Sequence, residues 1–370
     1  MDILILNWKD IKNPEAGGAE IIAFEFARRL VKEGHSVIFF SRCFNNCLNE
    51  EIADGVKIIR RGNKFTVYIQ AYLYYTGLTK KPQKVIDMIN TICWQTPLYV
   101  DKKSRIAYVN QLAKEVLFYE FFWPLSFIAY FLEKFEYVTY TNTKFICYSK
   151  STKEDLISFG VKEKNINTFP LGVDHDRYKK VGNKSKNPLF VFVARLVKNK
   201  RADLCIRSLK KVVEKYQKAS LYVFGNGPDA KRLQDLVIKE NLEKNVKFVN
   251  KNNFFIDKNI KDLKVNLMQK AWALLLPSVK EGWGMVVTEA AACGTPAIVS
   301  NVTGLRDSVI NNKTGIVLSK SPSEDELSQA MIGLIKDNQL RENLSREAYQ
   351  YSQSFNWNRS YEAFKKLILA

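Results

Sequence analysis

Histidine is scarce in this chain, because His35 and His175 are the two in 370 residues. The six cysteines are scattered and form no C-x-x-C pair. These counts offer no convincing set of zinc ligands, since structural zinc sites use four Cys or His side chains at close spacing. We therefore expect no zinc site, and cysteines of this kind fit a reduced, cytosolic setting.

Long apolar runs are also missing. The most lipid-like stretch, 116–131, is interrupted by Glu120 and Pro124. It is shorter than the roughly 20 apolar residues that a membrane-spanning helix needs. Residues 1–7 read as a buried strand and not as a signal peptide. We expect a cytoplasmic protein without a spanning segment.

Acidic residues are too few to balance the basic ones: 57 Lys and Arg stand against 38 Asp and Glu, a formal net charge of +19. After residue 176 there are 34 basic and 18 acidic residues, so most of the excess lies there. Such a charge suits nucleic acid or an anionic membrane, or a lysine-rich surface that contains a diphosphate site. No basic motif interleaved with aromatics is present, so we expect no nucleic-acid partner.

The most informative stretch is 273–300, where a short apolar run, a glycine-bearing turn and an alanine-rich segment follow one another. This pattern predicts a strand, a loop, a helix and a second strand. Gly282 and Gly284 flank Trp283 at the expected start of the helix. Backbone N–H groups at a helix start are free to bind an anion, so we expect a phosphate group there.

Two carboxylates frame this turn: Glu281 precedes it and Glu289 follows about two helical turns later. A carboxylate repels phosphate but accepts two hydrogen bonds from a vicinal diol, so sugar hydroxyls are its natural partners. The site therefore suits a sugar joined to a nucleotide through a diphosphate. The alternative interpretation is a surface loop with two solvated acids, which this specific spacing disfavours.

The segment from Glu281 to Glu289 resembles the E-x7-E signature of retaining glycosyltransferases of family 4, which have the GT-B fold. The resemblance implies an α/β protein in which two Rossmann-like domains face each other across a cleft. Residues 1–172 would hold the acceptor and 173–355 the nucleotide sugar. A final helix within 356–370 would pack back on the first domain.

The resemblance extends to the first loop, where Gly17 and Gly18 precede a helix expected over 19–32. Glycines at this place let the backbone approach a ligand. A plain turn also explains a Gly-Gly pair. In the family the Gly-Gly-Ala-Glu string faces the donor phosphates and the acceptor, which implies donor contact for Gly18 and acceptor-side roles for Gly17 and Glu20.

The residues after a strand expected over 104–109 resemble the family's His-Gln-Leu-Ala-Arg-Glu, with Asn110 in place of the histidine. In relatives this histidine touches the transferred sugar. Asn110 keeps a hydrogen-bonding group there but removes a titratable one. This departure leaves a second hypothesis open, a GT-B protein that binds a nucleotide sugar without turnover.

After a strand expected over 189–194, Arg195 and Lys200 match the arginine and lysine that hold the leaving diphosphate in the family. Cations at the carboxyl end of a strand lie where α/β sheets bind their ligands. Surface charge is the alternative interpretation, because other lysines lie nearby.

Gly225 and Gly227 follow a strand expected over 221–224 and, with Ala230, fit the dinucleotide fingerprint G-x-G-x-x-A. A nicotinamide-dependent enzyme is therefore a third hypothesis. That fingerprint needs an acid about 20 residues on, whereas 250–252 reads Asn-Lys-Asn, which disfavours it. The resemblance instead implies that this loop lines the nucleotide pocket.

Aromatic residues are concentrated in 67–75 and 116–131. We expect both stretches to be buried in the core. The alternative is an exposed patch that docks a lipid-linked acceptor at the cytoplasmic membrane face. The nearly neutral charge of the first domain disfavours this alternative, because binding to anionic lipid is normally aided by basic residues.

Together with these features, the resemblance to family 4 implies a metal-independent, retaining transferase of the hexosyltransferase type, without a cofactor, that uses a UDP- or GDP-sugar and a glycan or lipid-linked acceptor. The D-x-D string at 174–176, a metal site in other glycosyltransferases, is explained by a turn at the domain link. By the resemblance, Arg195 and Lys200 would stabilise the leaving diphosphate. Glu281 would bind the donor sugar and be the third catalytic residue, and Glu289 would bind the ribose. The predicted donor-binding residues are Gly18, Asn110, Gly225, Gly227, Gly282, Trp283, Gly284, Met285, Val286 and Glu289.

Overall fold

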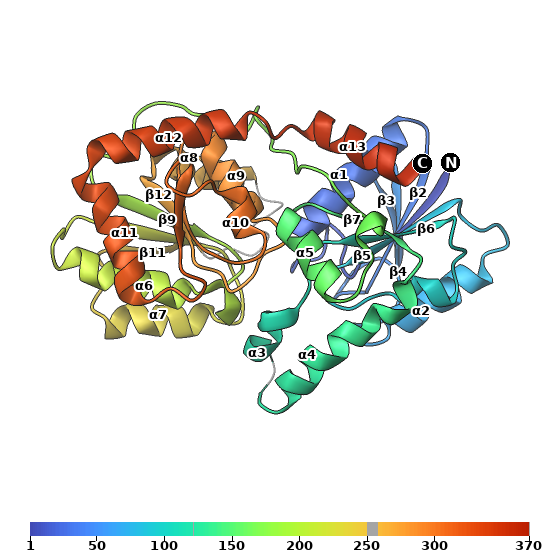
Figure 1. Ribbon diagram of the computed structural model, residues 1–370. Helices are drawn as coiled ribbons and strands as arrows, with labels where there is room; N and C mark the ends of the chain where they lie inside the picture. The colour runs from blue at the N-terminus through green and yellow to red at the C-terminus, as the bar shows by residue number, and fades with distance from the viewer. Residues whose placement is uncertain (121, 250–257, 370) are drawn as a thin grey trace. The chain divides into compact units, whose positions relative to one another are not determined.

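A computed structural model describes residues 1–120, 122–249 and 258–369, and the chain forms two compact units, each built around one sheet (Figure 1). Unit 1 comprises Met1–Pro170 and the residues from Tyr361 onward, and unit 2 comprises Leu171–Ser360. The helix α13 (Trp357–Leu369) therefore starts in unit 2 and ends in unit 1.

The boundary lies two residues earlier than 172 because the linking segment pairs within unit 2. Val173 forms a β-bridge with Asn356, and Gly172 packs against Trp357. A Cβ atom at Gly172 would lie 2.6 Å from Trp357 Cα, so only glycine permits this approach.

Unit 1 contains an eight-stranded sheet in the order β3-β4-β2-β1-β5-β6-β7-β8, in which β3 alone is antiparallel to its neighbour. Its inner strands are nearly continuous apolar runs, as expected for parallel strands covered on both faces. The strands are β1 (Asp2–Leu6), β2 (Ser36–Ser41), β3 (Glu50–Ala53), β4 (Val56–Arg60), β5 (Lys84–Ile89), β6 (Arg105–Val109), β7 (Lys144–Cys147) and β8 (Ile166–Thr168).

Helices cover this sheet between successive strands. The aromatic rings of Phe26 in α1 and Phe364 in α13 stack at 4.3 Å, which fixes the end of the chain to unit 1. The α-helices of unit 1, besides the end of α13, are α1 (Gly18–Lys32), α2 (Val67–Gly77), α3 (Leu117–Glu120), α4 (Leu125–Glu136) and α5 (Lys150–Ser158).

Unit 2 contains a six-stranded parallel sheet in the order β11-β10-β9-β12-β13-β14. This is the doubly wound order 3-2-1-4-5-6 of the Rossmann fold, and β4-β2-β1-β5-β6-β7 of unit 1 follows the same order. The expected α/β architecture with two Rossmann-like domains is thus confirmed. The strands are β9 (Leu189–Val193), β10 (Ser220–Phe224), β11 (Val246–Val249), β12 (Ala273–Leu276), β13 (Ala297–Ser300) and β14 (Gly315–Leu318).

The helices of unit 2 pack on its sheet, α6 against β10 and α9 against β12 and β13. They are α6 (Ala202–Val213), α7 (Ala230–Lys239), α8 (Lys258–Lys270), α9 (Met285–Ala292), α10 (Leu305–Ser308), α11 (Glu324–Lys336), α12 (Asn338–Ser352) and the first turn of α13.

The expectation that 116–131 forms core is wrong, because α4 turns its polar side inward. The Glu133 carboxylate accepts hydrogen bonds from the amides of Ala113 at 2.5 Å and Lys114 at 2.7 Å. Ser126 on the same side is also buried. The large apolar side chains of the segment consequently face outward, with Trp123 73% exposed. Phe121 lies outside the described residues.

Residues 67–75 are partly core, as α2 buries Val67, Ala71 and Tyr75 and exposes Ile69 and Leu73. In the part of the chain that the structure describes, no helix combines the length and apolar character needed to cross a bilayer.

Candidate functional site

The predicted cations and the first predicted carboxylate follow two neighbouring strands of unit 2. Arg195 and Lys200 come after β9, and Glu281 comes after β12. The chain leaves β9 toward one edge of the sheet and β12 toward the other, so the two loops diverge at the topological switch point. Open α/β sheets bind ligands at the carboxyl ends of the strands that flank this point.

Lys200 and Glu281 form an ion pair there. Lys200 Nζ lies 2.6 Å from Glu281 Oε1, and the Ser278 hydroxyl donates to the same oxygen at 3.0 Å. Arg195 is exposed, and its side chain has no partner among the described residues. The structure thus brings together two of the three predicted catalytic residues and leaves Arg195 available to a ligand.

The helix α9 begins beside this pair. Gly284 precedes its first turn at φ 83°, a conformation that glycine adopts without strain. Among the residues that the structure describes, the amides of Gly284, Met285 and Val286 donate to no protein acceptor. Free amides and the helix dipole favour an anion at this position, as expected from the glycines of the turn.

The loop after β13 packs on the same turn. The amide of Glu281 donates to the Thr303 carbonyl at 3.3 Å. A Cβ atom at Gly304 would lie 2.4 Å from the Glu281 carbonyl oxygen, so glycine is required there. Gly304 was not among the predicted site residues, although it shapes the loop that carries Glu281.

The side chain of Trp283 is packed inside unit 2. Its side chain is 8% exposed, and its ring lies 5.5 Å from the ring of Phe355 in an edge-on contact. Gly282, Met285 and Val286 are only half-buried. A donor molecule would therefore meet the backbone of Trp283 and not the face of its ring.

Glu289 is held by a lysine that sequence reasoning missed. Lys264 Nζ donates to Glu289 Oε2 at 2.6 Å and to the Tyr178 hydroxyl at 3.0 Å. Burial lowers the pKa of Lys264, but the Glu289 carboxylate and Tyr178 more than offset this and raise it above its ordinary value. Lys264 lies four residues from both Ile260 and Met268, so the three share one buried face of α8. This helical spacing is the sequence signal that could have indicated the burial of Lys264.

Gly225 and Gly227 are close-packed against the loop that carries Arg195. Cβ atoms at these positions would lie 1.9 Å from the Ala194 carbonyl oxygen and 2.2 Å from that of Leu196. They follow β10, whereas the dinucleotide fingerprint follows the first strand of the sheet, here β9. This position argues against a nicotinamide site; residues 250–252 lie outside the described residues.

In unit 1, Glu20 has a structural partner. Its carboxylate accepts a hydrogen bond from the amide of Gly17 at 2.6 Å and so caps α1, and the side chain is 3% exposed. Gly18 opens the helix. The contacts predicted for Gly17, Gly18 and Glu20 remain predictions.

Asn110 belongs to a chain of hydrogen bonds across the carboxyl edge of the sheet in unit 1. Its Nδ2 donates to Asn90 Oδ1 at 2.6 Å, Asn90 Nδ2 donates to Asn7 Oδ1 at 2.9 Å, and Asn7 Nδ2 donates to the Lys9 carbonyl at 2.9 Å. The Tyr148 hydroxyl donates to Asn110 Oδ1. These bonds fix the orientation of the Asn110 amide, which can offer its remaining N–H but no acid or base.

Two residues of the D-x-D string are hydrogen-bonded within unit 2. His175 Nε2 bonds to the Phe355 carbonyl at 2.8 Å, and Asp174 Oδ1 accepts from the amide of Arg177 at 3.2 Å. Within the described ranges, no group of three or more His, Cys, Asp or Glu is placed to hold a metal ion.

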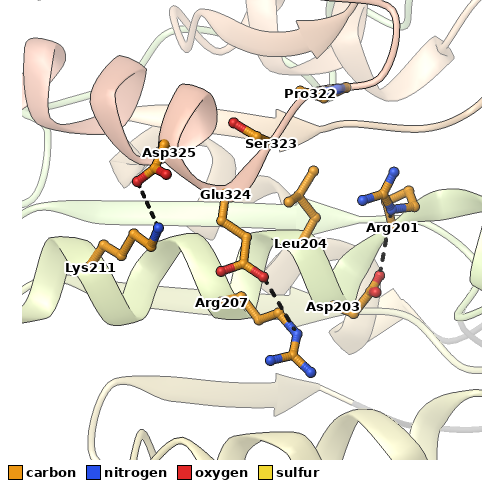
Figure 2. A pocket seen from close by; sticks show the side chains of 9 residues that line it. All are labelled: Arg201, Asp203, Leu204, Arg207, Lys211, Pro322, Ser323, Glu324 and Asp325. Carbon is orange, nitrogen blue, oxygen red and sulfur yellow. Dashed lines mark hydrogen bonds and ion pairs between the residues drawn. The ribbon is translucent and has the colours of Figure 1, made fainter.

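A depression of about 450 Å³ between α6 and α11 contains none of the predicted site residues (Figure 2). Its charges are paired with one another, Lys211 with Asp325 at 2.6 Å and Arg207 with Glu324 at 3.8 Å. We attribute no ligand to it.

Comparisons with known proteins give the family and the fold of the chain. A family model described as Glycosyl transferases group 1 matches residues 174–351, and one described as Glycosyltransferase Family 4 matches residues 16–177. An uncharacterised glycosyltransferase of Methanocaldococcus jannaschii is 26% identical over 234 residues, 63% of this chain. The match spans 61% of that relative's length, and the next two curated relatives are matched over 58% of theirs.

Two solved structures show the same fold. Sucrose-phosphate synthase from Thermosynechococcus elongatus has a TM-score of 0.80 at 19% identity and covers 99% of this chain and 98% of its own. Anabaena HepE in complex with UDP-glucose has a TM-score of 0.73 at 15% identity and covers 100% and 99%. With the two family models together matching 16–351, the chain belongs to the family 4 type of glycosyltransferases, which have the GT-B fold.

Proposed function

We propose that this protein is a retaining glycosyltransferase that moves a sugar from a UDP- or GDP-sugar to a glycan or lipid-linked acceptor. The observation that carries the proposal is the Lys200–Glu281 pair beside the free amides at the start of α9. It combines a cation, a carboxylate and an anion-binding helix end at the switch point of the sheet.

Before the donor binds, Glu281 neutralises Lys200. A diphosphate that binds the amides of Gly284 to Val286 pairs with the Lys200 ammonium group in place of Glu281. The Glu281 carboxylate then accepts hydrogen bonds from hydroxyls of the donor sugar. Arg195 supplies a second cation. These groups stabilise the charge that develops as the diphosphate leaves, without a metal ion or cofactor.

In the transfer step, the bond between the anomeric carbon and the diphosphate oxygen breaks while the acceptor oxygen bonds to that carbon. The acceptor's proton passes to an oxygen of the leaving phosphate. Both events occur on one face of the sugar, so the anomeric configuration is retained. Asn110 offers a hydrogen bond to the sugar, and Glu289, oriented by Lys264, binds the ribose hydroxyls.

The two carboxylates are expected to respond differently to substitution. Glu289→Gln should raise KM for the nucleotide sugar about tenfold with little change in kcat, because the ribose does not change in the reaction. Glu281→Gln should lower kcat by about 10²-fold, because its contact lies at the reacting sugar. Steady-state kinetics with the working donor measures both constants. Equal effects of the two substitutions on kcat would contradict these roles.

A GT-B protein that binds without turnover is the second candidate, and Asn110 in place of a titratable group is the observation that favours it. Calorimetric titration with UDP and GDP, followed by a donor hydrolysis assay, separates the two. Binding with neither hydrolysis nor transfer supports the second candidate.

We further propose that the protein is cytoplasmic and docks on the membrane face through an aromatic hairpin, the exposed apolar side chains of residues 117–120 and 122–138. The exposed side chains include Phe122, Trp123 and Phe131, at 71%, 73% and 63%. At about 200 Å² for each aromatic side chain, the patch is on the order of 1,000 Å², more than the few hundred Å² usual for monomers. Phe131 lies on the exposed face of α4, and Phe122 and Trp123 lie just before that helix. Exposed Trp and Phe side chains suit the lipid interface.

If the aromatic hairpin docks on lipid, the protein should co-sediment with phosphatidylcholine liposomes. The bound fraction should depend little on salt, because no charged side chain is exposed from Phe122 to Leu132. The double variant Trp123→Ser/Phe131→Ser should reduce the bound fraction at least fivefold. Ile69→Ser/Leu73→Ser is the matched control, since these apolar residues of α2 are also exposed. A parent protein that stays in the supernatant would contradict membrane docking, and a dimer that is lost in the double variant would show that another copy covers the hairpin.

A further inference from the structure

Three loops of unit 1 surround a second pocket, of about 480 Å³, formed by residues 13–15, 42–45 and 63–65. They follow β1, β2 and β4, which are adjacent parallel strands in the order β4-β2-β1. The pocket therefore lies at the carboxyl edge of the sheet, where doubly wound sheets bind ligands. We call it the edge pocket.

A buried ion pair connects loops that line the edge pocket. Arg60 and Asp10 form a bidentate ion pair at 2.7 and 2.8 Å, and both side chains are fully buried. Ser41 donates to the same carboxylate at 3.0 Å. Since Asp10 belongs to the loop after β1 and Arg60 ends β4, the ion pair holds two of the three lining loops together.

Polar groups at the edge pocket lack partners. Asn13 is 3% exposed, and its Oδ1 accepts from the amide of Glu15 at 2.9 Å, which fixes the direction of the amide group. Asn13 Nδ2 and Arg42 Nε are buried and have no hydrogen-bond partner in the described chain. A buried N–H without a partner costs about 1–3 kcal/mol, so a ligand that supplies hydroxyl oxygens would satisfy both groups.

The charge of the pocket is positive. Arg42 pairs with Glu15 at 2.6 Å, with its guanidinium 4.9 Å from the centre of the Trp8 ring. Lys64 has no ion pair among the described residues, and its Nζ lies 4.8 Å from the centre of the Phe65 ring. Phe65 is 74% exposed. The rim thus presents an unmatched cation beside an open aromatic face.

We propose that the edge pocket binds the acceptor and selects a sugar or other polyol that carries a phosphate or carboxylate group. Asn13 and Arg42 donate to its hydroxyls, the apolar face of the ring stacks on Phe65, and Lys64 pairs with the anionic group. Assigning this ligand as the acceptor rests on the proposed transferase function, but the binding chemistry rests on these residues alone.

The test uses four probes, glucose 6-phosphate, glucuronate, glucose and inorganic phosphate, with saturation-transfer NMR on the full-length protein. Glucose 6-phosphate and glucuronate should bind at least tenfold more tightly than glucose or phosphate. Lys64→Ala and Phe65→Ser, both exposed and so compatible with folding, should each weaken the two anionic sugars about tenfold. Lys80→Ala is the matched control, because Lys80 is exposed at the opposite edge of the same sheet, paired with Asp2.

Each other outcome overturns the proposal. If inorganic phosphate binds as tightly as glucose 6-phosphate, the pocket is a simple anion site. If glucose binds equally well, Lys64 does not select charge. UDP and GDP are titrated into the same variants to measure nucleotide binding independently of sugar binding. Nucleotide binding without any sugar binding removes the edge-pocket proposal alone, whereas sugar binding without nucleotide binding removes the transferase proposal and leaves the pocket.

Discussion

Replacing Arg195 or Lys200 with alanine should lower kcat about 10²–10³-fold, the cost of removing one group that stabilises a developing oxyanion. Arg195 is exposed and Lys200 is paired in a loop, so neither substitution removes core packing. Each cation meets charge that grows during departure of the diphosphate, and kcat should therefore fall more than nucleotide affinity. Initial rates of nucleoside diphosphate release measure the effect.

Lys198→Ala is the matched control for these variants, since Lys198 is an exposed lysine in the same loop. It should leave kcat within twofold of the parent value. Circular dichroism melting checks that all variants fold. If the double variant Arg195→Ala/Lys200→Ala keeps near-normal activity, or if Lys198→Ala is as harmful as Lys200→Ala, the diphosphate does not lie between these cations.

Removing the guanidinium of Arg60 is expected to have the largest effect on stability. Arg60→Met should destabilise the protein by about 3–5 kcal/mol, because it leaves the Asp10 carboxylate buried without its cation. Burial lowers the pKa of Arg60, but Asp10 and Glu51 more than offset this and raise it above its ordinary value, so the pair is ionised. Urea denaturation followed by circular dichroism gives the change.

Arg61→Met is the control, because Arg61 is next in the chain and forms a surface pair with Glu50. Exposed pairs contribute about 0–1 kcal/mol. The double variant Asp10→Leu/Arg60→Met should recover part of the loss, since apolar residues can replace a buried pair. A cost for Arg60→Met no larger than that for Arg61→Met would show that the pair does not hold unit 1 together.

The stretch 273–300 was predictable from sequence because its signals are local. A short apolar strand, glycines at positive φ and a helix stopped at Gly294 each depend on neighbouring residues, and the structure has them as β12, α9 and β13. The positions of Arg195 and Lys200 are also set locally, since both lie in the loop that follows the buried strand β9.

Partners that lie far apart in the chain were not predictable. Lys264 reaches Glu289 from another helix, and Asn90 reaches Asn110 only because β5 and β6 are neighbours in the sheet. One repeated signal was available, since Asn7, Asn90 and Asn110 each stand one residue past a strand. This repeated asparagine indicates a hydrogen-bonded chain only once the strand order shows that β1, β5 and β6 are adjacent.

The orientation of α4 also could not be predicted from the sequence. Its apolar composition indicates core, but Glu133 turns toward the amides of Ala113 and Lys114 and so directs the apolar face outward. Which face of such a helix is buried depends on the groups available nearby, and composition does not contain that information.

We expect unit 2 to hold a nucleoside diphosphate sugar and the protein to release the sugar from it. The direct test is a calorimetric titration with UDP and GDP. It is followed by an assay of nucleoside diphosphate release from the matching nucleotide sugars, on the same preparation of protein. We predict that one nucleotide binds, that at least one of its sugar conjugates is cleaved to release the nucleoside diphosphate, and that Lys200→Ala lowers the rate of this release about 10²–10³-fold. A folded protein that binds neither nucleotide, or that releases the nucleoside diphosphate equally well after Lys200→Ala, would contradict the proposed transferase function.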